Sequence, residues 1–241
     1  MRVHHYGHAI VGFENALDVT EEQVSGFISN LESLSDLDSM HTNEETGAIT
    51  NSGGYEFFPE AVNTQPTRYQ DLHYPGISDV DASFVDSIDE TLSKCLLGYL
   101  DLFPAANDCV QWRTNGHIAK YEPGQSMGPH SDNTIPRNEP SRLAPLMNTL
   151  TAGVFLNGNY VGGNLYFRQW NITPKTPALS AIIYPSAFSG CHEVTEVTSG
   201  VRHTFLCWYG QGPYGGYQTS IPKIVRESKI REIPEGHIGD V

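Results

Sequence analysis

The sequence predicts a mainly β fold with flanking α-helices, in the form of a double-layer jelly roll buttressed by N-terminal helices. Two segments with helical periodicity precede residue 105, short strand-like segments dominate after it, and glycine and proline turns separate these strands. We expect a single domain over the 241 residues. Its expected parts are a helical N-terminal support with loops at 1–104, a jelly-roll core at 105–210 and a C-terminal tail at 211–241.

The N-terminal part contains one short strand and two amphipathic helices. Residues 9–15 are mostly apolar and predict a buried strand. The first helix is expected to begin after Thr20, whose side chain is a typical N-cap, and to continue to about Leu34. The second helix is expected to be capped by Asp81 and to end near Phe103-Pro104, with one apolar stripe along its length.

Two stretches between these elements lack a regular pattern. Residues 33–54 are polar and predict a loop, and the run to residue 70 is predicted to be irregular. Residues 110–121 predict two strands joined by a hairpin turn at Thr114-Asn115-Gly116. The glycine-rich residues 210–217 predict either a lid or a connector. The later strands are predicted at residues 150–157, 164–167, 179–184, 193–197 and 201–208.

Charge and composition exclude several classes of function. A net charge of −14 with only 14 Lys plus Arg argues against a broad nucleic-acid face, which needs a basic stripe. The first residues lack the apolar run of a signal peptide, and no stretch has the length of a membrane span. The four cysteines show no metal-type spacing and are expected to be small buried apolar residues. These features predict a cytoplasmic protein without a membrane partner; they disfavour a nucleic-acid partner but leave a local basic groove open.

A His-x-Asp pair at His130 and Asp132, with a distant second histidine at His192, forms a candidate metal site. Side chains two residues apart lie on the same side of an extended chain, so the pair can converge. Two imidazoles and one carboxylate suit Fe(II) and leave its other positions open for a co-substrate and oxygen. With 10 His and 28 Asp plus Glu, roughly one such pair is expected by chance, so the rest of the pattern must decide.

The rest of the pattern is an ordered series of residues after the pair: Phe155-Leu156-Asn157, Gly162-Gly163, Phe167, His192-Glu193-Val194, Val197, Gly200, Arg202 and Trp208. In this order and spacing, about residues 105–210 resemble the prolyl-hydroxylase-like branch of the 2-oxoglutarate and Fe(II)-dependent dioxygenases. The resemblance implies a double-stranded β-helix. It also implies Fe(II), 2-oxoglutarate and O2 as cofactors, with ascorbate as a candidate addition.

The resemblance assigns roles to six residues. Three are the implied iron ligands and catalytic centre: His130, Asp132 and His192. Three are the implied co-substrate contacts: Arg202, Tyr121 and Thr151. The guanidinium of Arg202 is expected to form a bidentate fork with the far carboxylate of 2-oxoglutarate.

Two positions set this chain apart within the resemblance. Many relatives have a tyrosine where this chain has Phe155, and that hydroxyl helps to hold the far carboxylate. Its absence leaves that contact to Arg202. The related halogenases have a small residue at the position of Asp132, so a carboxylate there favours hydroxylation over halogenation.

The expected activity is therefore hydroxylation of an unactivated C–H bond, with release of succinate and CO2. The substrate is expected to be a small molecule, a free amino acid or a peptidyl (prolyl-type) residue. Nucleobase repair fits poorly, because no second arginine at the spacing of that branch precedes Trp208. The alternative from another class is a non-catalytic jelly-roll binding module with a degenerate metal site.

Overall fold

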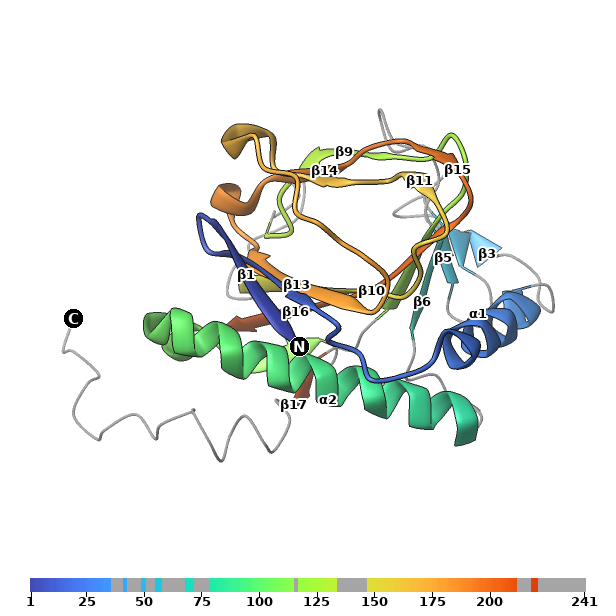
Figure 1. Cartoon of the computed structure of the whole chain (residues 1–241), viewed down its shortest axis with the longest axis horizontal. Helices are drawn as coiled ribbons and strands as arrows, with labels where there is room; N and C mark the ends of the chain where they lie inside the picture. The colour runs from blue at the N-terminus through green and yellow to red at the C-terminus, as the bar shows by residue number, and fades with distance from the viewer. Residues whose placement is uncertain are drawn as a thin grey trace.

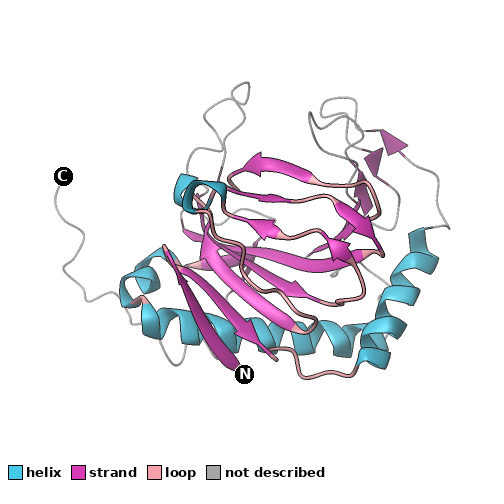
Figure 2. Cartoon of the chain, turned by 45° about the horizontal axis from the view of Figure 1, so that its top comes forward, coloured by secondary structure: helices cyan, strands magenta, loops and turns pink. Residues whose placement is uncertain are grey.

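The computed structural model describes residues 1–35, 41–42, 49–50, 55–57, 68–71, 79–114, 117–133, 147–211 and 218–220. Two layers of antiparallel strands face each other, and the long helix α2 (Asp79–Leu102) runs beneath the larger layer (Figure 1). Figure 2 shows α2 and the helix α1 (Glu21–Ser35) along one side of the strands, and a short helical turn on the opposite side. The fold is the jelly roll with flanking helices that the sequence predicts.

The larger sheet has the strand order β1-β2-β13-β10-β16-β8-β6-β5-β4-β3, with β7 beside β16 and β17 beside β7. Its strands are β1 (Arg2–Gly7), β2 (Ile10–Glu14), β3 (His41–Thr42), β4 (Ile49–Thr50), β5 (Tyr55–Phe57), β6 (Arg68–Asp71), β7 (Trp112–Thr114), β8 (His117–Tyr121), β10 (Met147–Phe155), β13 (Ser180–Pro185), β16 (Arg202–Gln211) and β17 (Gln218–Ser220).

The smaller layer is formed by two short sheets, β12-β14-β9 and β11-β15. Its strands are β9 (Met127–His130), β11 (Val161–Gly162), β12 (Leu165–Tyr166), β14 (His192–Val194) and β15 (Val197–Ser199). The remaining elements are α1 (Glu21–Ser35) and three 3-10 turns, η1 (Pro104–Cys109), η3 (Arg168–Trp170) and η4 (Phe188–Gly190).

Alternation along the central strands divides the interior into two cores. On β10, Ala152 and Val154 pack with α1 and α2 in a core between the larger sheet and the helices. Phe155 packs with residues of both layers in a second core between the two sheets. Because side chains alternate along a strand, one face of β10 packs against the helices and the other face packs into the space between the two layers. The candidate site lies in that inner space.

The N-terminal end of α1 has the predicted cap. The Gln23 amide donates to the Thr20 hydroxyl at 3.1 Å, and the Thr20 amide donates to the Gln23 side-chain carbonyl at 2.8 Å. This reciprocal pair is a capping box, which satisfies amides that the helix itself leaves unpaired. The buried strand predicted at residues 9–15 is also present as β2.

Four sequence-based predictions are wrong in the described residues. Asp81 is not the cap of α2 but lies inside the helix, where it is buried and accepts a hydrogen bond from Asn30 of α1 at 3.1 Å. The residues expected to be irregular include β5 and β6, because tertiary pairing of β6 with β8 gives them a partner that local propensity cannot reveal. The loop expected at 33–54 likewise contains β3 and β4.

The fourth correction concerns the predicted hairpin at residues 110–121. β7 and β8 do not pair with each other; they occupy successive stretches along the same edge of β16. The lid or connector predicted at 210–217 lies outside the described residues except for residues 210–211, which end β16. The division into support, core and tail stays a prediction, although β1 and β2 show that N-terminal residues also contribute strands to the larger sheet.

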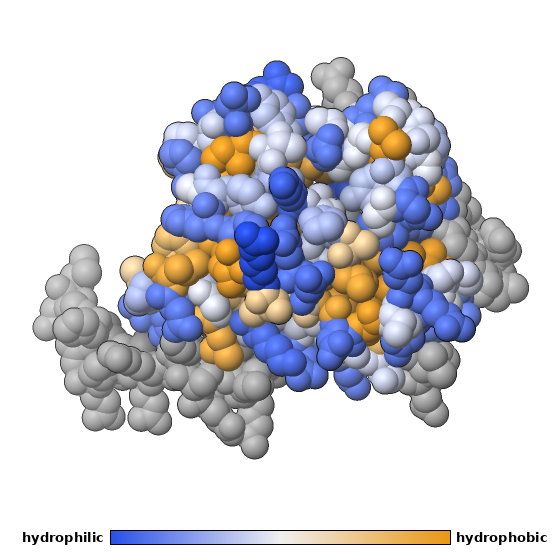
Figure 3. Space-filling model, viewed as in Figure 1, coloured by the Kyte–Doolittle hydropathy of each residue, from blue (hydrophilic) through white to orange (hydrophobic). Residues whose placement is uncertain are grey.

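Among the described residues, none of the helices has both the length and the apolar character needed to cross a membrane. On the face drawn in Figure 3, apolar residues gather in the lower half, with hydrophilic residues between and above them. Among the residues whose burial the structure describes, the exposed large apolar residues are Met1, Val3, Leu102, Val161 and Phe188.

Candidate active site

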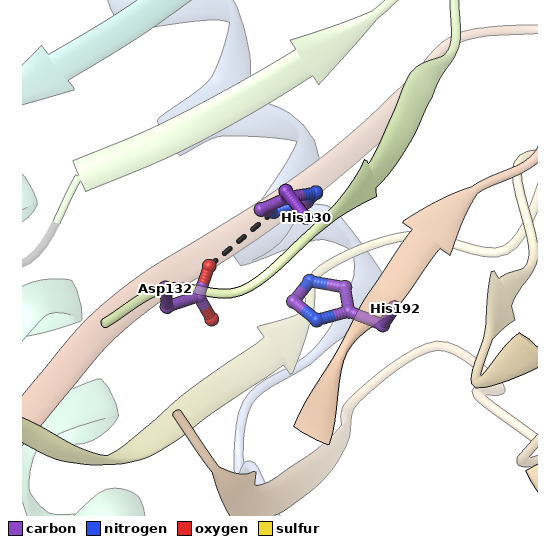
Figure 4. A group of neighbouring side chains, drawn as sticks. All are labelled: His130, Asp132 and His192. Atoms are coloured by element: carbon purple, nitrogen blue, oxygen red, sulfur yellow. Dashed lines mark ion pairs between the residues drawn. The ribbon is translucent and has the colours of Figure 1, made fainter. Parts of the chain in front are cut away.

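The side chains of His130, Asp132 and His192 converge between the two layers (Figure 4). One ligand atom from each lies within 4.8 Å of the others. His130 ends β9 and His192 begins β14, and the two residues are direct partners across these paired strands. Asp132 follows two residues after His130. The strand pairing therefore brings together two histidines that are far apart in the sequence.

Both histidines are oriented by a backbone carbonyl two residues earlier. His130 Nδ1 lies 2.9 Å from the Gly128 carbonyl oxygen, and His192 Nδ1 lies 3.0 Å from the Gly190 carbonyl oxygen. A carbonyl only accepts, so in the neutral form of each ring Nδ1 carries the proton and the lone pair lies on Nε2. This is the arrangement in which outer hydrogen bonds prepare histidines for a metal. Gly190 permits it, since an added Cβ would lie 1.7 Å from the Pro185 carbonyl oxygen.

The carboxylate of Asp132 is held on both of its oxygens. Oδ1 lies 3.3 Å from His130 Nε2. Oδ2 accepts a hydrogen bond of 2.6 Å from the Thr151 hydroxyl, which is also 2.8 Å from the hydroxyl of Ser186. The carboxylate thus faces the imidazoles with one oxygen while β10 fixes the other.

The protonation states suit a cation at this point. Burial raises the pKa of Asp132, but its hydrogen bond to His130 and the nearby His192 and Thr151 together lower that pKa to about 2. Burial lowers the pKa of His192 to about 4. For His130, burial acts to lower the pKa, but the adjacent Asp132 carboxylate outweighs it and raises the pKa. A charged carboxylate and neutral His192 are therefore present at neutral pH.

Arg202 begins β16 and is only 3% exposed. Its guanidinium carbon lies 5.1 Å from the ring centre of Tyr121 and 5.4 Å from that of Phe155. Among the described residues its Nε has no hydrogen-bond partner, and no carboxylate forms an ion pair with it. The hydroxyl of Thr204, two residues along the same face, is likewise buried without a partner in the described part of the chain. A buried guanidinium is costly unless something anionic joins it.

The backbone on both sides of Arg202 is fixed by Asn157. The Asn157 side-chain amide donates to the Val201 carbonyl at 2.6 Å, and its carbonyl accepts from the His203 amide at 2.8 Å. Gly163 leaves room for the arginine stem, since a Cβ there would lie 3.0 Å from Arg202 Cδ. The Asn and Gly positions of the sequence motif therefore serve the placement of this arginine.

The structure places the six predicted site residues as follows. Three converge in the candidate metal cluster, and Tyr121 is the direct partner of Arg202 across β8 and β16. Thr151 lies against Asp132, so its hydroxyl supports the carboxylate in this structure. Its expected contact with the co-substrate stays a prediction.

Sequence reasoning missed Tyr184. This residue is buried on β13, directly opposite Thr151 on β10. Its hydroxyl lies 3.1 Å from His192 Nε2 and 3.5 Å from Asp132 Oδ2. Burial raises the pKa of its phenol well above the ordinary value. Strand alternation over 180–184, combined with the pairing to β10, was the signal that could have placed it at the site.

Comparison with known proteins agrees with this geometry. Residues 116–210 match the family described as the 2OG-Fe(II) oxygenase superfamily. Two relatives, both named PKHD-type hydroxylase, come from Caulobacter sp. (strain K31) and Shewanella baltica. Each is 37% identical, over 93 and 95 residues respectively, which is 37% of this chain in both cases. The chain spans only 40% and 39% of the length of these relatives.

Solved structures share the fold at low sequence identity. A Trichoplax adhaerens prolyl hydroxylase, solved with a hypoxia inducible factor peptide, has a TM-score of 0.58 at 16% identity, covering 84% of each chain. A viral collagen prolyl hydroxylase from Paramecium Bursaria Chlorella virus-1 has a TM-score of 0.51 at 14% identity, covering 83% of this chain and 94% of its own. Residues 116–210 are thus similar to the 2OG-Fe(II) oxygenase superfamily, their converged triad has the residue types of its metal site, and the fold is that of prolyl hydroxylases of known structure.

Proposed function

We propose that this protein is an Fe(II)- and 2-oxoglutarate-dependent hydroxylase of an amino acid, a peptidyl (prolyl-type) residue or a small molecule. The observation that carries the proposal is the pairing of the converged triad with a buried arginine that lacks an anionic partner among the described residues. A binding module with a degenerate site has no need for either feature.

The residues present fit the cofactors that the family implies. His130, Asp132 and His192 would hold Fe(II), because both Nε2 lone pairs and one carboxylate oxygen face a common point. Arg202 would hold the far carboxylate of 2-oxoglutarate, with the ring of Tyr121 beside it. When bound, iron and 2-oxoglutarate supply the oxidising power, so that O2 yields a hydroxylated product, succinate and CO2. A dependence on ascorbate stays a prediction.

The protein's own residues orient and shield this chemistry. The Gly128 and Gly190 carbonyls fix the imidazole rings, and Thr151 fixes the carboxylate of Asp132. The apolar core between the layers limits the entry of water and strengthens the attraction between Arg202 and an anionic ligand. These residues therefore prepare the site before any ligand arrives.

We propose that the substrate contacts the segment 186–190, which adjoins the triad. Ser186 touches Thr151, and the Gly190 carbonyl accepts from His192. Between them Phe188 is 80% exposed, which is unusual for a phenylalanine. An exposed aromatic ring beside the metal site suits the apolar part of a peptide or amino-acid substrate. Phe188→Ala is expected to leave uncoupled 2-oxoglutarate turnover unchanged and to raise the KM for substrate, measured once a substrate is found.

Formation of succinate from 2-oxoglutarate tests the proposed function. We expect succinate only when Fe(II), O2 and 2-oxoglutarate are all present, and a mass increase of one oxygen in a substrate from a peptide and amino-acid panel. His192→Ala is expected to lose metal binding and turnover together. Full turnover by His192→Ala in the presence of a chelator would refute the assignment.

The product should be hydroxylated and not chlorinated, because Asp132 occupies the third protein position beside the metal. Mass spectrometry of products formed in chloride and in chloride-free buffer checks this outcome. Asp132→Gly is expected to lose activity, since it removes a charged ligand. A chlorine isotope pattern in the product of the unaltered protein would contradict the role given to Asp132.

A further inference from the structure

Tyr184 is the one phenol that touches two candidate metal ligands in the described part of the chain. Its hydroxyl lies 3.1 Å from His192 Nε2 and 3.5 Å from Asp132 Oδ2. Its ring is held in place by an edge contact with Phe167, at 5.0 Å between ring centres. The hydroxyl is therefore fixed beside the point where the three ligand atoms meet.

The contact between Tyr184 and His192 uses the lone pair that a metal needs. His192 Nδ1 is committed as a donor to the Gly190 carbonyl, so Nε2 is the acceptor of a neutral ring and the phenol donates to it. A metal bound at Nε2 takes the same lone pair. The two interactions exclude each other, and metal binding leaves the Tyr184 proton without its present acceptor.

Among the described residues, two side chains besides His192 lie near this hydroxyl: Thr151, which hydrogen-bonds to Tyr184, and Asp132. Asp132 Oδ2 is 3.5 Å away, which is too long for a strong hydrogen bond, and it already accepts from Thr151 at 2.6 Å. A buried hydroxyl that loses its acceptor is destabilising, so a ligand that offers an oxygen at this place is favoured.

We propose that Tyr184 donates a hydrogen bond to the metal-chelating keto-acid end of bound 2-oxoglutarate. This inference rests on the proposed function. Under this proposal the two ends of 2-oxoglutarate have different protein partners: Arg202 binds the far carboxylate, and Tyr184 binds the metal-chelating end beside His192. Phe155 offers Arg202 only a ring, at 5.4 Å, so among these residues the hydroxyl of Tyr184 is the one beside the metal-chelating end.

Calorimetric titrations of the Mn(II)-loaded protein in the absence of O2, so that no turnover occurs, test this assignment. The two probes are 2-oxoglutarate and oxalate, which keeps a metal-chelating end but lacks the far carboxylate. The variants are Tyr184→Phe, which keeps the ring that packs on Phe167, and Arg202→Gln. The matched control is Tyr209→Phe, because Tyr209 is equally buried but belongs to the core beside the helices, with its hydroxyl 3.4 Å from the Leu92 carbonyl.

Tyr184→Phe is expected to weaken both probes about tenfold or more, as for loss of a hydrogen bond to a charged group. Its Mn(II) affinity should be unchanged or higher, because the competing hydrogen bond to His192 is gone. Arg202→Gln should weaken 2-oxoglutarate alone, and Tyr209→Phe should weaken neither probe. A merely structural role for Tyr184 predicts a loss of Mn(II) affinity instead.

Two results would overturn the inference. The first is that Tyr184→Phe binds both probes as tightly as the unaltered protein does. This result would refute the role of Tyr184 but would not affect the proposed function. The second is a Tyr184→Phe protein that binds Mn(II) more weakly, which makes the residue a support of the triad. If the unaltered Mn(II)-loaded protein binds no 2-oxoglutarate at all, the proposed function itself fails.

Discussion

Arg202 is expected to lower the stability of the ligand-free protein, and Arg202→Met should therefore raise it. The guanidinium is 3% exposed and has no ion-pair partner among the described residues. The cost of burying this charge is partly offset by cation–π contacts with Tyr121 and Phe155, whose ring centres lie 5.1 and 5.4 Å from the guanidinium carbon. A buried charge that destabilises the ligand-free protein is explained if an anionic ligand binds to it.

The expected gain follows from these contacts. Burying an ion costs several kcal/mol, and each cation–π contact returns roughly 0.5–2 kcal/mol, so the net gain on substitution is about 1–3 kcal/mol. Methionine fills a similar volume without a charge. For a chain of this size the midpoint of thermal unfolding should rise by about 3–10 °C.

Arg113→Met is the matched control, with the opposite sign. Arg113 is also buried, at 2% exposed, but its guanidinium donates to Asp89 at 2.8 Å. Its removal leaves that carboxylate without this partner. Because the Asp89 side chain is 27% exposed, the loss should be about 1–3 kcal/mol, less than for a fully buried pair.

Urea unfolding followed by circular dichroism measures both variants without ligand. A second series adds Mn(II) and 2-oxoglutarate at about 100 times the dissociation constant, which should stabilise the unaltered protein by about 2.7 kcal/mol. Arg202→Met should gain much less from 2-oxoglutarate. If Arg202→Met destabilises the ligand-free protein as Arg113→Met does, the arginine is structural and the argument for an anion site is refuted.

Three further outcomes are expected. Burial raises the pKa of the Cys95 and Cys207 thiols to about 12, so neither should react with a disulfide reagent at pH 8 until the protein unfolds; fast labelling of four thiols in the native protein would contradict this. Gly163→Ala should weaken 2-oxoglutarate at least fivefold with little change in metal affinity, since its Cβ would press on Arg202 Cδ, and equal losses of both affinities would point to general unfolding. Asn157→Ala should likewise raise the 2-oxoglutarate dissociation constant about tenfold in the same titration, because it removes both hydrogen bonds that fix the backbone around Arg202.

The sequence predicts the parts of this fold whose signal is local. The capping box at Thr20 and the helical stripe of α2 depend on residues a few positions apart, and both helices are present. Asp81 has the composition of a cap, but burial against Asn30 of α1 decides its place, and that contact joins residues 51 positions apart. β5 and β6 are missed for the same reason, because a partner strand supplies the pairing that makes them strands.

The residues of the candidate site likewise fall into those that can be identified from the sequence and those that can be identified only from the strand pairing. His130, Asp132 and His192 can be found from spacing, because metal chemistry demands a narrow choice of side chains. Tyr184 carries no such mark in the sequence, since a tyrosine that ends an apolar strand is most often a core residue. Only the register between β10 and β13, which sets it opposite Thr151, brings its hydroxyl to His192. The metal ligands can therefore be recognised from their residue types and spacing. A residue that contacts a ligand bound to the metal, such as Tyr184, can be recognised only from strand pairing.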